Sequence, residues 1–183
     1  MSPVSKGRKR RANRKASGRP RRPLAPQLAP GFDPTPYLAD APPGTDALDR
    51  RVFAVPRCSA SIDGEDYDRL NPADPDDRGL LIRGEHPEYD EILADPLFEG
   101  EFEGHNPRLH LTMHEVIANQ LWDDDPPEVW QAAQRLRDQG FDRHEILHGL
   151  ANVLAERMFP VLTDNVPFDS AAYRQDLDGL GRR

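Results

Sequence analysis

Cysteine is almost absent from this sequence of 183 residues, in which Cys58 is the single one. A chain with one cysteine forms no intrachain disulfide and offers no cysteine-rich zinc site. Long apolar runs are also missing, and none approaches the roughly 20 residues that a membrane-spanning helix needs. The basic N-terminus is not followed by an apolar stretch, so we expect no secretory signal in it. We therefore expect a cytoplasmic protein without membrane contact.

Acidic residues are missing from one end of the chain, and lysine is missing from the rest. Residues 1–30 contain ten Lys or Arg and no acid, whereas the remainder has 14 Arg, no Lys and 32 acids. The overall charge of −8 therefore combines +10 with −18. The basic arm, residues 1–22, has no aromatic side chain to stack on bases. We expect at most weak, non-specific contact of this arm with nucleic acid or with an acidic partner.

Proline divides the chain into a tail and a packable part. Residues 23–45 hold seven prolines, and such a stretch buries too little apolar surface to offset its ordering entropy. We predict that residues 1–45 form a disordered basic arm and Pro-rich linker, followed by a helical domain over residues 46–183. Residues 57–78 are polar and turn-rich, and we predict no regular element there.

Helix boundaries are marked clearly in the second half of the sequence. Asn106 followed by Pro107 is an N-cap followed by a first-turn proline, and it predicts a helix over residues 107–122. Comparable signals predict helices from the prolines at 126–127 to Gly140 and over residues 143–158. Shorter helices are indicated at residues 46–55, after Pro87 and after Asp169. The predicted fold is all-α, a small helical bundle of four to five short helices with a disordered basic N-terminal tail.

Histidine is sparse but patterned. Two pairs, His110/His114 and His144/His148, are spaced i, i+4, which places both imidazoles of each pair on one helical face. His86 has the same spacing to a carboxylate, Asp90. Helices that offer imidazole and carboxylate groups in pairs are typical of metal sites in bundles. We predict a divalent metal, Zn, Fe or Mn, bound by His86, Asp90, His110, His114, His144 and His148.

Other polar residues fall near these pairs. Glu88 and Gln120 are expected to orient the ligands, and Glu145 or Glu88 is a candidate base if the centre is catalytic. Residues 144–148 spell HExxH, the zinc-peptidase motif. Asp142 and Glu145 also fit a capping box, which explains the glutamate without peptidase chemistry. His105 precedes the helix cap and is predicted at the surface.

A second hypothesis belongs to another functional class. In a non-enzymatic interaction module, the histidines would form a buried hydrogen-bonded network, and residues 1–22 would contact nucleic acid or an acidic partner. A metal protein would lose stability under chelation, whereas an interaction module would not. An HExxH metallohydrolase is the third reading.

Three blocks of the sequence resemble a bacterial family catalogued as domain of unknown function 1841. The family pattern is HPEYH, then NPFLHxxxHxxxxEQ, then HxxxH, and the resemblance covers about residues 76–180. It matches at His86, Pro87, Glu88, Tyr89, Asn106, Pro107, Leu109, His110, His114, Gln120, His144 and His148.

The chain departs from the family pattern at three positions. Asp90 replaces the second histidine of the first block, Asn119 replaces an acidic residue, and Arg108 replaces an aromatic one. The glutamate of HExxH is not part of the pattern, which disfavours a peptidase. The resemblance implies a shared histidine site and fold, and it implies no reaction.

Overall fold

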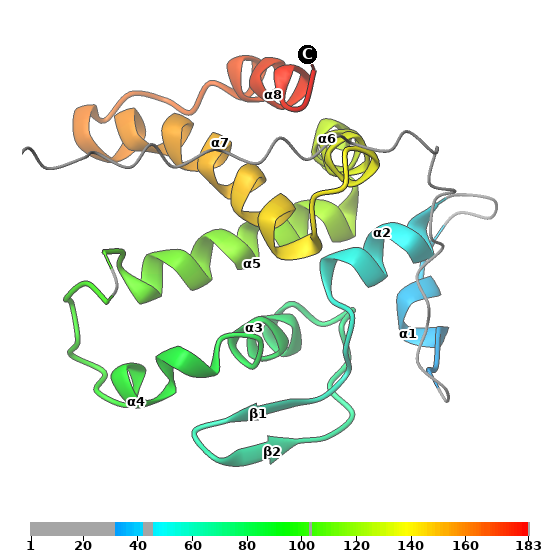
Figure 1. Ribbon diagram of the computed structural model, residues 1–183, viewed down its shortest axis with the longest axis vertical. Helices are drawn as coiled ribbons and strands as arrows, with labels where there is room; N and C mark the ends of the chain where they lie inside the picture. Colours follow the sequence, from blue (N-terminus) through cyan, green and yellow to red (C-terminus); the bar gives the residue numbers. More distant parts are fainter. Residues whose placement is uncertain (1–31, 42–45, 103, 183) are drawn as a thin grey trace, which may run out of the picture.

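The structure, a computed structural model, describes residues 32–41, 46–102 and 104–182. The predicted basic arm and most of the predicted linker lie outside the described residues. The described part is mostly helical, with one 3-10 helix (η1) and two short strands (Figure 1). Its elements are α1 (Thr35–Leu38), α2 (Ala47–Ala54), β1 (Ala60–Ile62), β2 (Glu65–Tyr67), α3 (Pro75–Arg83), η1 (Pro87–Tyr89), α4 (Asp90–Leu93), α5 (Pro107–Asp123), α6 (Pro127–Asp138), α7 (Arg143–Asp164) and α8 (Ser170–Gly179).

Helix α5 runs through the middle of the molecule, with α3 on one side and α7 on the other (Figure 1). It begins as predicted, because the side chain of Asn106 accepts the backbone N–H of Leu109 at 3.0 Å. Apolar residues on more than one of its faces are buried, among them Ile117, Leu121 and Ala118. Helices α2 and α3 both pack against α5, as does α7. Helix α5 is therefore held in place by neighbouring helices on more than one side.

Helices α6, α7 and α8 follow their predicted boundaries at the start. The capping box at the start of α7 is confirmed: the Asp142 side chain accepts the N–H of Glu145, and the Glu145 side chain accepts the N–H of Asp142, both at 2.9 Å. Helix α7 continues to Asp164, past its predicted end and past Pro160. None of the described helices is long and apolar enough to cross a membrane.

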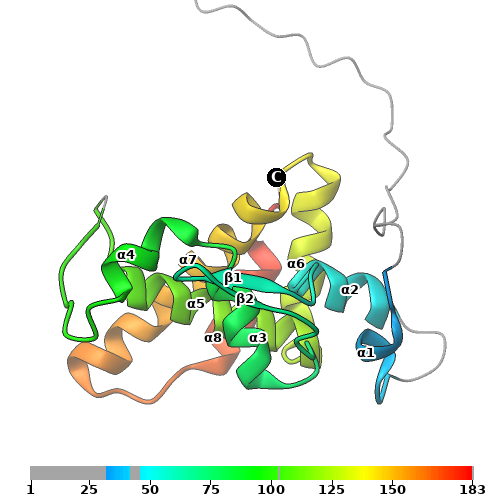
Figure 2. The ribbon, with the colours of Figure 1, turned by 90° about the horizontal axis from the view of Figure 1, so that it is seen from below.

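Two elements lie where no regular structure was predicted. Strands β1 and β2 form an antiparallel hairpin that lies outside α3 (Figure 2). Its turn is Asp63-Gly64, with φ of 54° and 79°, and two positive φ angles are the signature of an Asp-Gly type I′ turn. Helix α3 starts with an Asp74 side chain that accepts the N–H of Asp76, followed by Pro75. Both signals are present in the sequence, so the prediction for residues 57–78 was wrong.

The predicted fold class also needs two corrections. Eight α-helices occur among the described residues, rather than four to five, and the hairpin makes the fold mostly helical instead of all-α. The linker prediction is wrong for residues 32–41, where α1 forms and Tyr37 is fully buried. The Tyr37 ring packs at 5.7 Å from that of Trp122, and this apolar contact orders a proline-containing segment.

Buried arginines hold the C-terminal end of α5. Arg50 donates to the carbonyl oxygens of Leu121 and Trp122, and Arg51 donates to Trp122 and to carbonyls of the α1 segment. The last carbonyls of a helix lack intrahelical donors and carry partial negative charge, so guanidinium groups suit this position. Arg51 and Arg78 each place the guanidinium carbon 4.8 Å from the centroid of the Trp122 ring. These cation–π contacts help to lock α1, α2 and α3 onto the end of α5.

Replacement of Arg51 by methionine is expected to destabilise the fold. The carbonyl oxygens of Tyr37, Ala39 and Trp122 would lose a donor, and we expect the free energy of unfolding to fall by about 2–4 kcal/mol. Urea denaturation measures this change. The matched control is Arg69→Met at an exposed position, and equal stability of the two variants would contradict the role given to Arg51.

Candidate metal centre

Three segments bring five imidazole rings together. His110 and His114 lie one turn apart on α5, with ring centroids 4.5 Å apart, and His144 and His148 lie on α7 at 4.2 Å. His86, the residue before η1, places its ring 4.8 Å from that of His114. The predicted convergence of the histidine segments is therefore present in the structure.

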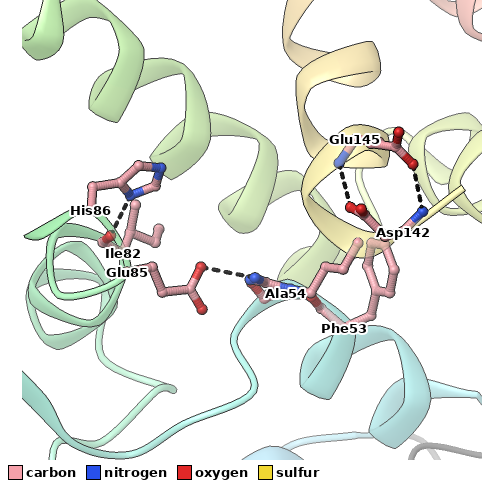
Figure 3. A network of polar contacts seen from close by, with 8 residues as sticks. Phe53, Ala54, Ile82, Glu85, His86, Asp142 and Glu145 are labelled. Atoms are coloured by element: carbon pink, nitrogen blue, oxygen red, sulfur yellow. Dashed lines mark hydrogen bonds and ion pairs between the residues drawn. The ribbon is translucent and has the colours of Figure 1, made fainter. Parts of the chain in front are cut away.

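His86 has a defined tautomer. The residue is 1 % exposed, and its Nδ1 lies 2.9 Å from the backbone oxygen of Ile82, one turn earlier at the end of α3 (Figure 3). A carbonyl oxygen only accepts hydrogen bonds, so Nδ1 carries the proton and donates it. The Nε2 atom is then left with a lone pair. A hydrogen bond from the other ring nitrogen to a backbone carbonyl is the usual support of a metal-binding histidine.

Ring nitrogens of several histidines lie close together and are buried. One ligand atom each from His86, His110 and His114 lie within 4.8 Å of one another. Four Nε2 atoms are buried without a hydrogen-bond partner among the described residues, those of His86, His110, His114 and His148. A buried polar atom without a partner costs free energy of about 1–3 kcal/mol. The cluster is therefore a costly arrangement in the absence of a group that all four atoms can bind.

Ring spacing matches the size of a metal ion with imidazole ligands. Imidazole nitrogens bind Zn²⁺ at about 2.0–2.1 Å, which places ring centroids about 3.2 Å from the ion and about 5 Å from one another. Five of the pairs formed by the rings of His86, His110, His114 and His148 have centroids 4.5–5.0 Å apart. The rings lie close enough to share one ion.

Burial favours the neutral form of His110, His114 and His148 by lowering their pKa values. Desolvation, assisted by the neighbouring histidines, lowers the pKa of His110 to about 4 and that of His114 to about 2. The pKa of His148 is lowered for the same reasons, desolvation first and His144 next. A neutral imidazole retains the lone pair that a metal requires, so the folded protein favours the state that can bind one.

Arg143 connects the segment that carries His144 with the segment that carries His86. It donates to the last two carbonyls of α2, both at 2.6 Å, and forms an ion pair of 2.8 Å with Glu85. Arg143 precedes His144, and Glu85 precedes His86, so the pair joins the residues adjacent to two of the rings. The sequence analysis missed this contact, because neither residue belongs to a histidine pair.

Neither Asp90 nor Glu88 is in the group of ligand atoms within 4.8 Å of one another, and Oδ1 of Asp90 is buried without a hydrogen-bond partner among the described residues. Asp90 accepts the backbone N–H of Asp63 in the hairpin turn, and Glu88 is exposed. Gln120 accepts the hydroxyl of Tyr173 at 2.7 Å and so holds α8. Asp90 was predicted from i, i+4 spacing, but His86 has φ −127° and ψ 58° and is not helical. The spacing rule therefore does not apply to this pair.

The remaining candidates lie at the edge. His144 is exposed, with its ring 5.5 Å from that of His114. Figure 3 shows Glu145 turned toward Asp142 and away from His86, in agreement with the capping box. His105 is exposed as predicted, yet its Nε2 lies 2.6 Å from the hydroxyl of Tyr89. The Tyr89 ring lies parallel to that of His86 at 5.9 Å, a support that the sequence analysis did not assign.

Fold and site together define a small, mostly helical protein with a cluster of imidazoles whose Nε2 atoms are largely buried. The family described as Domain of unknown function (DUF1841) matches residues 76–178, which is more than half of the chain. The chain belongs to this family, and the resemblance noted in its sequence is confirmed. No curated protein and no solved structure matches the chain.

The lowered pKa values predict how stability depends on pH in metal-free protein. The unfolded chain protonates these imidazoles near the ordinary pKa of 6.5, whereas the folded protein does so only near about 4 for His110 and about 2 for His114. Between these values the unfolded state binds more protons, so stability falls as the pH falls below about 6.5. Urea midpoints of chelator-treated protein between pH of about 7 and about 5 measure the decline.

The variant His110→Gln/His114→Gln provides the comparison. It removes the two imidazoles with the largest shifts, so its urea midpoint should fall less steeply over the same pH range. Equal slopes for the two proteins would contradict the assignment of neutral, buried imidazoles.

Proposed function

We propose that this protein binds one divalent transition-metal ion through the Nε2 atoms of His86, His110 and His114, with His148 as a fourth ligand. The observation that carries the proposal is the set of four buried Nε2 atoms without hydrogen-bond partners among the described residues. His144 flanks the ion from the exposed side of the cluster. The fixed tautomer of His86 and the spacing of the rings support the same conclusion.

The ligand chemistry favours zinc or iron. Imidazole suits Zn and Fe, whereas Mn prefers carboxylate, carbonyl and water oxygens. Asp90 would have supplied a carboxylate, but neither of its oxygens belongs to the group of ligand atoms that lie within 4.8 Å of one another. A site made of imidazoles is therefore a weaker candidate for Mn than the sequence analysis suggested.

The structure gives less support to the two other readings. In a hydrogen-bonded histidine network, each lone pair would face a donor, and the four Nε2 atoms have none among the described residues. In a peptidase of the HExxH type, the glutamate activates water, but Glu145 accepts the N–H of Asp142 instead. Contact of residues 1–22 with nucleic acid or an acidic partner stays a prediction, because those residues lie outside the described part.

Metal content and thermal stability test the proposal. Protein purified without added metal, then supplied with Zn²⁺ or Fe²⁺, should hold about one equivalent by elemental analysis. An ion that binds only the folded state at about 1,000 times its Kd adds about 4 kcal/mol, which for a domain of this size raises Tm by about 10 °C. A chelator should reverse this gain.

The variant His110→Ala/His148→Ala should lose the metal and show no response of Tm to the chelator. The matched control is His105→Ala, which removes an exposed imidazole near the cluster and should keep both properties. A parent protein that stays folded and binds neither ion would rule out the metal. Loss of metal from the control as well would place the site elsewhere.

A further inference from the structure

A cavity of about 300 Å³ lies directly against the histidine cluster. It is formed between one face of α5 and one face of α7, and three of the four rings with unpartnered Nε2 atoms are part of its wall. The lining residues are His105, Asn106, Leu109, His110, Met113, His114, His148, Ala151, Asn152 and Ala155. His86 is not among them, so the cavity meets the cluster on the side of His110, His114 and His148.

Helical spacing explains why this wall is continuous. On α7 the lining residues recur at positions 148, 151, 152 and 155, and on α5 at 109, 110, 113 and 114. Steps of three and four residues keep side chains on one helical face. The alanines on α7 leave space that larger side chains would fill. Apolar Leu109, which is 51 % exposed, stands where the space opens toward solvent.

The size and lining of the cavity limit its occupant. Sites for small molecules measure about 300–1,000 Å³ and combine apolar walls with a few polar groups, so this cavity accepts a compact ligand. Leu109, Met113 and the alanines supply the apolar wall, and Asn152 and His105 supply polar groups. Among the described residues, those that line the cavity include no acid.

Charge then selects the chemistry of the ligand. Neutral imidazoles leave the full +2 charge of a bound ion uncompensated, and a buried charge without a counter-charge is costly. Neither Asp90 nor Glu145 belongs to the group of possible ligand atoms that lie within 4.8 Å of one another, and Glu145 caps α7. An anionic ligand would offset the charge directly.

We infer that the metal ion keeps a fifth, open coordination position toward this cavity beside the four imidazoles, and that this position takes the carboxylate of a small monocarboxylic acid. This inference rests on the proposed metal site. One carboxylate oxygen binds the ion, and the apolar chain of the acid lies against Leu109, Met113 and Ala155. Asn152 and His105 are within the same wall and suit the second oxygen.

Cobalt-loaded protein provides the test, because the visible spectrum of Co²⁺ reports changes in its ligands. Titration with acetate and then with butyrate should change the spectrum in a saturable way. Butyrate should bind more tightly than acetate by about threefold or more for each added methylene that the cavity buries.

Ala155→Leu fills the cavity without removing a histidine. Its Co²⁺ content should equal that of the parent, whereas its affinity for butyrate should fall about tenfold or more and its preference over acetate should disappear. The matched control is Ala171→Leu, the same substitution at an exposed position on α8. It should bind Co²⁺ and both acids as the parent does.

The outcomes separate the two proposals. Failure of the parent to take up Co²⁺, Zn²⁺ or Fe²⁺ would overturn the metal site itself. Stoichiometric Co²⁺ with a spectrum unchanged by either acid would leave the metal site standing and overturn the open position. Equal affinities for acetate and butyrate, or equal behaviour of the Ala155→Leu and Ala171→Leu variants, would overturn the assignment of the cavity as the place where the chain of the acid lies.

Discussion

The interior of this protein holds imidazole nitrogens close together without hydrogen-bond donors among the described residues, and the surrounding helices are packed around that constraint. The Nε2 atoms of His86, His110, His114 and His148 are buried and receive no hydrogen bond from the described residues. Protonation would supply donors, but desolvation opposes the charged form, and the pKa of His114 is lowered to about 2. A divalent cation would accept such lone pairs, which is why we propose that the cluster binds a metal.

The cluster depends on parts of the chain outside the family match. The match begins at residue 76, yet α2 lies before it, and the last two carbonyls of α2 accept hydrogen bonds from Arg143 beside His144. Arg50 and Arg51 of α2 bind the carbonyls at the end of α5, the helix that carries two of the rings. Segments that precede the family region therefore help to position the helices that carry the histidines.

Much of the site could be predicted from sequence because helix signals are local. The caps at Asn106 and Asp142 fix the starts of α5 and α7, and i, i+4 spacing then places both histidine pairs. The same rule failed for Asp90, since His86 precedes a 3-10 helix. The contacts of Arg143 and Tyr89 join distant segments, and no local pattern encodes them. The hairpin and α3 also had local signals, an Asp-Gly turn and an Asp-Pro cap. We predicted no regular element there because residues 57–78 are polar and turn-rich.

X-ray absorption spectroscopy of the zinc-loaded protein tests the central claim most directly, because it reports the atoms around the ion. The account predicts a first shell of nitrogen at about 2.0–2.1 Å, with the outer-shell scattering of three or four imidazole rings. A first shell of oxygen atoms without imidazole scattering would contradict it, and would mean that the ion binds elsewhere on this acidic chain.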